Sequence, residues 1–187
     1  MLKLFSWKTK NTRVVQGAVI DELAAKICAA SVAEANSVIV RNANIPKGKA
    51  IAISQLFCQG LIQLTDRIAY TTIPSTKRAE VMDRLMFVAA AYLIKEYAGD
   101  NYSREEISDI VNKCVNENNQ MLLYLGQFKK FTSDSDDDLP GNFFWEFGKV
   151  FAEKIGHKDD AEFATLAAES LMNLFEDLNA KSILASI

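Results

Sequence analysis

The chain has 187 residues, of which 49% are hydrophobic and 24% charged, with only 8 glycines and 3 prolines. This composition fits one compact domain with a substantial core and argues against extensive disorder. The net charge is −3, and no element concentrates basic residues, so nucleic acid is not an expected partner.

Hydrophobic periodicity is helical along nearly the whole chain. Apolar residues recur at steps of three and four in six segments, and none alternates for the length of a strand. We therefore predict an all-α, single-domain bundle of about six helices with mostly antiparallel neighbours. Residues 1–16 form a basic, partly apolar N-terminal arm in this interpretation, and residues 17–187 form the bundle. No uninterrupted apolar run approaches the ~20 residues of a membrane span.

The first predicted helix covers residues 17–42, and the second covers about residues 50–73. The second helix carries glutamines four residues apart on an otherwise apolar segment, which places them on one narrow stripe with an aspartate. We interpret this stripe as solvated amides or as the lining of a groove. The groove candidates are Gln55, Gln59, Gln63 and Asp66.

Helix-capping signals mark the remaining elements. The third helix follows Pro74 and is expected to end at Gly99. Ser103 and Glu106 form an S-x-x-E capping box that should begin the fourth helix. An acidic loop at residues 132–142 precedes the fifth helix, residues 143–155, and is the best place for a subdivision of the bundle. Asp159 is expected to cap the sixth helix, which runs to about residue 178.

The three cysteines lie far apart in the sequence, each within an apolar helical pattern. Cys28, Cys58 and Cys114 are therefore expected to be free, buried thiols, which favours a reducing, cytoplasmic location over a disulfide framework.

The sequence argues against the common metal and nucleophile chemistries. His157 is the single histidine, and its place after Gly156 suits a cation at the negative end of a helix dipole. Two E-x-x-D pairs, at residues 80–83 and 106–109, begin consecutive helices, which antiparallel packing would separate by roughly 30 Å. The aspartate run at residues 134–138 lacks the glycine and glutamate of an EF-hand loop. We assign no catalytic residue, metal ligand or cofactor.

The leading functional hypothesis is a non-enzymatic protein-interaction module, such as an adaptor, an inhibitor or an immunity-type protein. Residues 101–187 hold 8 Lys and Arg against 16 Asp and Glu, a net charge of −8, so a protein partner would meet an acidic surface. The candidate contact residues are Asp134, Asp136, Asp137, Asp138, Phe143 and Trp145.

Two other function classes stay open. One is a helical hydrolase or transferase whose carboxylates converge only in the folded protein. The other is a peripheral membrane protein that uses the apolar and basic residues of the N-terminal arm. A homo-oligomer is compatible with each hypothesis.

Overall fold

The computed structural model confirms the all-α prediction. It describes the backbone of residues 2–98, 103–128 and 141–187, and the side chains of these residues except 2–16, 104, 118 and 122. These parts of the chain contain α-helices and one short 3-10 turn but no strand. The elements are α1 (Leu2–Arg41), η1 (Lys47–Lys49), α2 (Ala50–Thr72), α3 (Ser75–Ala98), α4 (Arg104–Leu125), α5 (Phe143–Ile155), α6 (Ala161–Leu178) and α7 (Ala180–Leu184).

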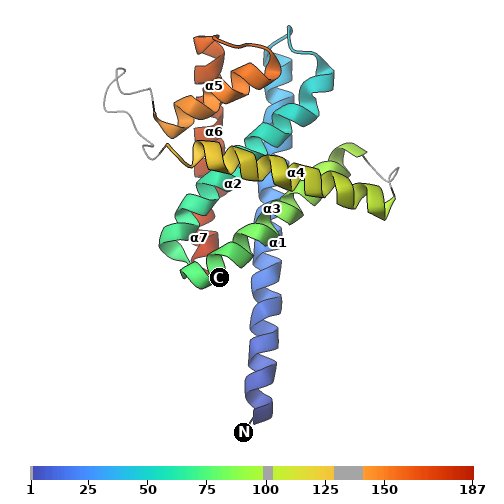
Figure 1. Cartoon of the computed structure of the whole chain (residues 1–187), viewed down its shortest axis with the longest axis vertical. Coiled ribbons are helices and arrows are strands. Elements are labelled where there is room, and N and C mark those ends of the chain that lie inside the picture. The colour runs from blue at the N-terminus through green and yellow to red at the C-terminus, as the bar shows by residue number, and fades with distance from the viewer. Residues whose placement is uncertain (1, 99–102, 129–140) are drawn as a thin grey trace.

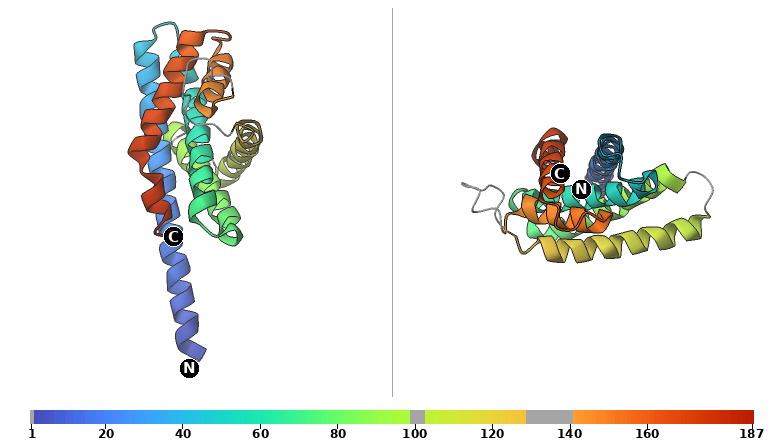
Figure 2. Two further views of the ribbon diagram at one scale, coloured as in Figure 1. Left: turned by 90° about the vertical axis from the view of Figure 1, so that its left-hand side faces the viewer. Right: turned by 90° about the horizontal axis from the view of Figure 1, so that it is seen from above.

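Helix α2 occupies the centre of the bundle (Figures 1 and 2). It contacts α1, α3, α4, α5, α6 and α7, and residues 56–65 are buried without interruption. A helix that is buried on all sides must be apolar around most of its circumference, and the α2 sequence has this property. Helices α1 and α2 run in opposite directions, whereas α4 lies across them (Figure 1).

Helix α1 begins earlier than the sequence analysis predicted. The expected start was residue 17, but one continuous helix runs from Leu2 to Arg41 and extends beyond the rest of the bundle (Figures 1 and 2). Residues 2–16 contain no proline or glycine that would interrupt a helix. The apolar pattern predicted only the part of α1 that lies beside the other helices (Figure 1).

Part of α1 also meets the length and composition criterion for crossing a membrane. Among the described residues, the segment Gly17–Arg41 is the one helical stretch that does so. The sequence analysis missed it because it counted uninterrupted apolar runs. Inside the protein, 39% of its most apolar window is buried. The core helix of a soluble protein passes the same test, so this criterion alone assigns no location.

Two glycines allow α5 and α6 to approach their neighbours closely. A Cβ atom on Gly60 of α2 would lie 2.8 Å from the Phe147 ring and 2.9 Å from Leu171. A Cβ atom on Gly148 of α5 would lie 2.1 Å from the backbone oxygen of Ala164 on α6. The absence of a side chain at these positions therefore sets the distances between α2, α5 and α6.

Polar contacts connect α1 to α3 and α6. The Glu34 carboxylate of α1 accepts a hydrogen bond from the Ser170 hydroxyl of α6 at 2.8 Å and pairs with Arg41 at 2.5 Å. The Asp21 carboxylate accepts two hydrogen bonds from the Arg84 guanidinium of α3, at 2.8 and 2.7 Å. These contacts fix the rotation of α1 against α3 and α6.

Helix caps agree with the sequence in two cases and differ in one. The Ser103 hydroxyl and backbone N–H both contact Glu106, as a capping box requires. Gly156 ends α5 in the left-handed conformation, with φ of 96°. The α6 cap is Asp160 and not Asp159, because Asp160 accepts the hydrogen bond from the Phe163 N–H. The expected end of the third helix, Gly99, lies outside the described residues.

The cysteines are free thiols, as expected. Cys28 and Cys58 are buried and Cys114 is half-buried. Burial raises the pKa of Cys28 to about 11, with a smaller contribution from Glu96. Burial also raises the pKa of Cys58 and Cys114. These thiols are therefore protonated at neutral pH, which lowers their reactivity.

Replacing Gly148 by alanine should destabilise the protein by about 2 kcal/mol or more, because the new methyl group would overlap the α6 backbone. The gain in helix propensity, about 0.5–1 kcal/mol, opposes this loss but is smaller. Urea denaturation measures the change. Gly48→Ala is the matched control, since nothing lies within 4 Å of its Cβ position. Equal stability of the two variants would contradict the close α5–α6 packing.

The native thiols should react with a disulfide reagent at clearly different rates at pH 8, and Cys58 should be the slowest because it is buried and protonated. All three should react at once in denaturant. The rate at Cys28 should keep rising above pH 9, toward its pKa of about 11, because only the thiolate reacts. Cys58→Ala should remove the slowest phase. Fast, uniform labelling of the native protein would show that α2 is not enclosed.

Candidate binding groove

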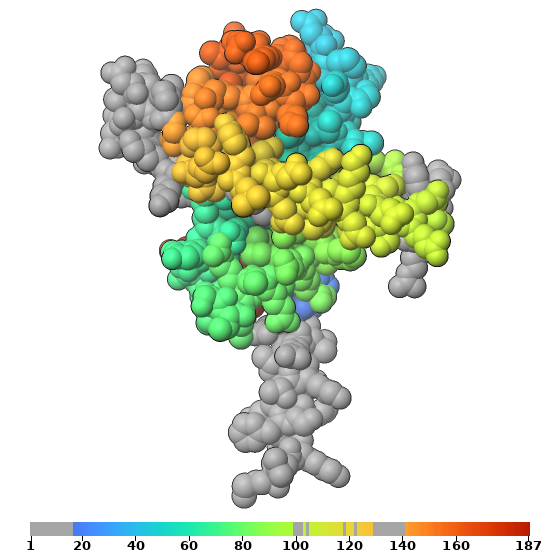
Figure 3. All heavy atoms as spheres, viewed as in Figure 1, coloured from blue at the N-terminus to red at the C-terminus, as the bar shows by residue number. Residues whose placement is uncertain are grey.

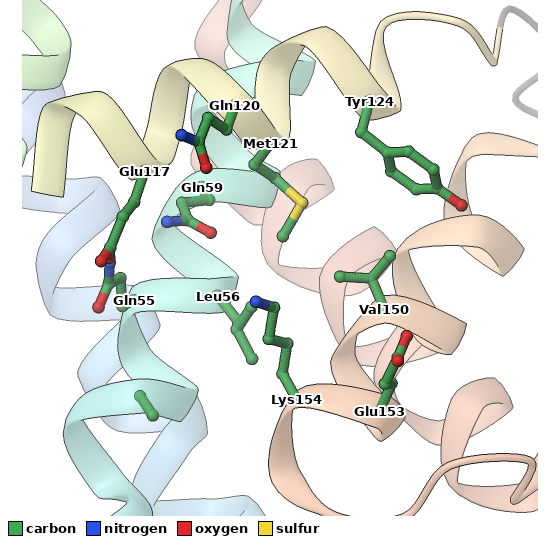
Figure 4. Close-up of a pocket in the computed structure, with 11 residues that line it drawn as sticks. Gln55, Leu56, Gln59, Glu117, Gln120, Met121, Tyr124, Val150, Glu153 and Lys154 are labelled. Atoms are coloured by element: carbon green, nitrogen blue, oxygen red, sulfur yellow. The ribbon is translucent and has the colours of Figure 1, made fainter.

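A cavity of about 590 Å³ lies between α2, α4 and α5 (Figure 4). Its volume falls within the range of about 300–1,000 Å³ that is common for ligand sites. The space-filling view shows α4 crossing the molecule between α5 and the α2–α3 region (Figure 3). The lining residues are Ala52, Gln55, Leu56, Gln59, Glu117, Gln120, Met121, Tyr124, Val150, Glu153 and Lys154.

Each helix contributes one regular stripe to this groove. The lining positions on α2 are 52, 55, 56 and 59, and those on α4 are 117, 120, 121 and 124. On α5 they are 150, 153 and 154. Spacings of three and four residues place side chains on one face of a helix. The groove is thus formed by three helix faces that meet without closing against each other.

Gln59 is the least exposed polar residue of the lining. Its exposed fraction is 5%, and it makes no hydrogen bond with any other described residue. Figure 4 shows Gln59 and Gln120 extending from α2 and α4 toward the same space. Among the described residues, the buried side-chain atom that lacks a hydrogen-bond partner is Oε1 of Gln63, so the Gln59 amide still reaches solvent. The donor and acceptor of this amide are therefore available to a ligand in the groove.

Gln55 has a partner across the groove. Its Nε2 donates a hydrogen bond to the Glu117 carboxylate at 2.6 Å, which joins α2 to α4 (Figure 4). The amide oxygen and one N–H of Gln55 remain available to a ligand. Gln55 and Gln59 thus both lie where the groove interpretation of the polar stripe expected them.

The other two members of the stripe lie elsewhere. Gln63 is 4% exposed, does not line the cavity, and its Oε1 has no hydrogen-bond partner in the described structure. Asp66 accepts two hydrogen bonds from the Arg78 guanidinium at the start of α3. Hydrogen bonding to Asp66 raises the pKa of Arg78, whereas burial acts in the opposite direction. Gln63 is separated from Gln55 for a geometric reason. Each four-residue step rotates about 40° around the helix, so Gln63 lies about 80° away from Gln55.

A second cavity of about 400 Å³ continues the groove along α5. It shares Tyr124, Val150 and Glu153 with the first cavity and is also lined by Trp145. Beside it, the buried Glu146 carboxylate pairs with Lys149 at 2.7 Å. The Tyr124 hydroxyl donates to Glu146 at 3.5 Å, and burial followed by this negative charge raises the tyrosine pKa.

The predicted acidic contact surface is only partly described. Asp134, Asp136, Asp137 and Asp138 lie outside the described residues. Phe143 is fully buried, with the Arg67 guanidinium 4.6 Å from its ring centre, so it belongs to the core and not to an exposed surface.

His157 has a structural setting at the turn between α5 and α6. Its ring stacks on Phe163 with 4.6 Å between the ring centres, and its Nδ1 lies 3.5 Å from Asp160. Within the described part of the chain, no group of three or more His, Cys, Asp or Glu residues is arranged to hold a metal ion.

The sequence analysis did not identify the α4 and α5 faces of the groove. Glu117, Gln120 and Tyr124 have helical spacing, and so do Val150, Glu153 and Lys154. That spacing was visible in the sequence, but polar residues with helical spacing are also typical of any solvated face. Only the fold brings these residues to one cavity, because α4 lies across α2 and beside α5 (Figure 1).

Gln63→Leu should raise the free energy of unfolding by about 1 kcal/mol, because it replaces a buried amide that lacks a full set of partners with an apolar group of similar size. Urea denaturation followed by circular dichroism tests this. Gln55→Leu is the control and should not stabilise the protein, since it breaks the hydrogen bond to Glu117. A destabilised Gln63→Leu variant would show that this amide is satisfied in solution.

Comparisons with protein-family models, curated protein sequences and solved structures found no match to this chain. The function proposed below therefore rests on the geometry and chemistry of the groove.

Proposed function

We propose that this chain is a protein-interaction module that binds a peptide segment of a partner protein in the groove between α2, α4 and α5. The observation that carries the proposal is Gln59, a residue that is only 5% exposed, makes no hydrogen bond within the described structure and lines the groove. A bound segment would supply the hydrogen bonds that the fold leaves unmade.

The mixed character of the lining supports a peptide. Leu56, Met121 and Val150 offer apolar contact area, while three glutamines offer neutral donors and acceptors. Lys154 is the one basic residue among those that line the first cavity. A phosphate-rich ligand usually requires several arginines or lysines, so this lining favours a ligand of low net charge.

The surface beside the groove supports the same proposal. Leu123 of α4 is 77% exposed, and the neighbouring Tyr124 is 41% exposed and lines both cavities. Protein interfaces commonly combine an aromatic residue and apolar anchors with a polar rim. Glu153, Lys154 and Lys158 supply charges of both signs along the two cavities.

The enzyme hypothesis has one observation in its favour. Glu117 of α4 and Glu153 of α5 are carboxylates from different helices that line the same cavity. They lie at opposite sides of it, and Glu117 is hydrogen-bonded to Gln55 (Figure 4). Paired acid–base catalysis needs two carboxylates that act on one bond, and this arrangement supports peptide binding better.

Selection of a random-peptide display library on the purified chain tests the proposal. Enriched peptides should bind the wild type, measured by fluorescence anisotropy, and should lose about tenfold or more in affinity with Gln120→Arg, which places a long charged side chain in the groove. Val150→Arg is the second groove variant. Circular dichroism should show that both variants remain folded.

The matched control is Met172→Arg on α6, an exposed position that does not line either cavity. It should leave the affinity unchanged. The proposal fails if no peptide is enriched, or if the enriched peptides bind both groove variants as tightly as the wild type.

A further inference from the structure

We infer that this groove reads the main chain of its peptide, through the carboxamides of Gln55, Gln59 and Gln120, and holds one apolar side chain against Leu56, Met121 and Val150. The inference rests on the proposed function and adds the mode of recognition to it. The peptide is bound in an extended conformation, and most of its side chains make no specific contact with the groove.

The three glutamines have the hydrogen-bonding groups that a peptide main chain requires. A side-chain carboxamide has the same donor and acceptor groups as a peptide unit, and it is neutral. Gln59 and Gln120 make no hydrogen bond with the described residues, and they extend toward the same space from facing helices (Figure 4). A peptide unit finds both a donor and an acceptor in each of these neutral amides, whereas a charged ligand group finds no opposite charge on them.

The spacing of Gln55 and Gln59 along α2 is close to the two-residue repeat of an extended peptide. Gln55 and Gln59 are four residues apart on α2, so they are displaced along the helix axis by about 6 Å. An extended chain advances about 3.3 Å per residue, and its main-chain groups point to the same side at every second residue. The repeat of about 6.6 Å in the peptide therefore matches the glutamine pair on the helix.

Leu56, Met121 and Val150 provide an apolar area for one side chain of the peptide. Leu56 and Met121 have exposed fractions of only 6% and 9%, and Val150 is half-buried, so they form a small apolar area beside the amides. Side chains of an extended peptide alternate between its two faces. One apolar side chain can meet this area while its neighbours point away from it. Recognition by main-chain hydrogen bonds plus one side-chain pocket is the physical basis of strand-type peptide binding.

Scanning replacement of peptide bonds by esters in an enriched peptide tests the inference. An ester removes one N–H without adding bulk. Binding, measured by fluorescence anisotropy, should fall about tenfold at two positions that are two residues apart. An alanine scan of the same peptide should lower affinity at one apolar position and have little effect elsewhere.

The protein side of the test uses one substitution at two sites of the same helix. Gln59→Leu should weaken binding by about tenfold while the fold is retained, because it removes the groove amide and keeps similar volume. Gln63→Leu is the matched control, since Gln63 does not line the groove, and it should leave affinity unchanged.

The outcomes separate this inference from the proposed function. If peptides bind in the groove but esters are tolerated throughout and many side chains matter, or if Gln59→Leu binds normally, recognition is by side chains and the inference is wrong. In that case the peptide-binding function still stands. If no peptide is enriched at all, the proposed function itself fails.

Discussion

The bundle depends on the enclosure of the middle of α2. Ten consecutive residues of this helix, 56–65, are buried, so every polar group among them must find a partner within the protein or remain unsatisfied. Thr65 donates to the Leu61 carbonyl at 2.7 Å, and the nearby Ser54 shares a hydrogen bond of 2.7 Å with Tyr97. Gln59 has no such partner in the described structure. Two glutamines are therefore exceptions, Gln59 in the groove lining and Gln63, whose Oε1 is buried without a partner outside the groove.

The groove itself follows from unequal packing on the two sides of α5. On the α6 side, Gly148 allows backbone contact with Ala164, and Phe147, Phe151 and Phe163 fill the space around it. On the α4 side, Glu153 and Lys154 line the cavity, and α4 runs beside α5 as it crosses the molecule (Figure 3). Close packing on one face and a crossing helix on the other leave a hollow that side chains line but do not fill.

Much of this fold could be predicted from the sequence, because helical periodicity and capping chemistry are local. The capping box at Ser103 and the left-handed Gly156 needed only neighbouring residues to be recognised. The start of α1 was predicted too late because the apolar pattern begins near residue 17, whereas the helix begins at Leu2. Asp159 and Asp160 are adjacent candidates, and only the backbone decides between them, with Asp159 at φ of 65°.

The candidate site was predictable in part. The polar stripe on α2 was visible in the sequence, but the sequence did not distinguish among its four residues. The structure divides them, since Asp66 pairs with Arg78 and Gln63 is enclosed. The residues that line the same cavity as Gln55 and Gln59 come from α4 and α5, about 60–100 residues later in the chain. Such long-range placement depends on the crossing of α4 over α2, which no local rule specifies.

The contact between Glu34 and Ser170 joins residues that are 136 positions apart. Helices α1 and α2 are synthesised before α6. Until α6 has been made, the Glu34 carboxylate can pair with Arg41 of its own helix but not with Ser170. The faces of α2 that later receive Phe147 and Leu171 are likewise uncovered in the nascent chain. The enclosure of residues 56–65 of α2 is therefore completed only after α5, α6 and α7 have been synthesised.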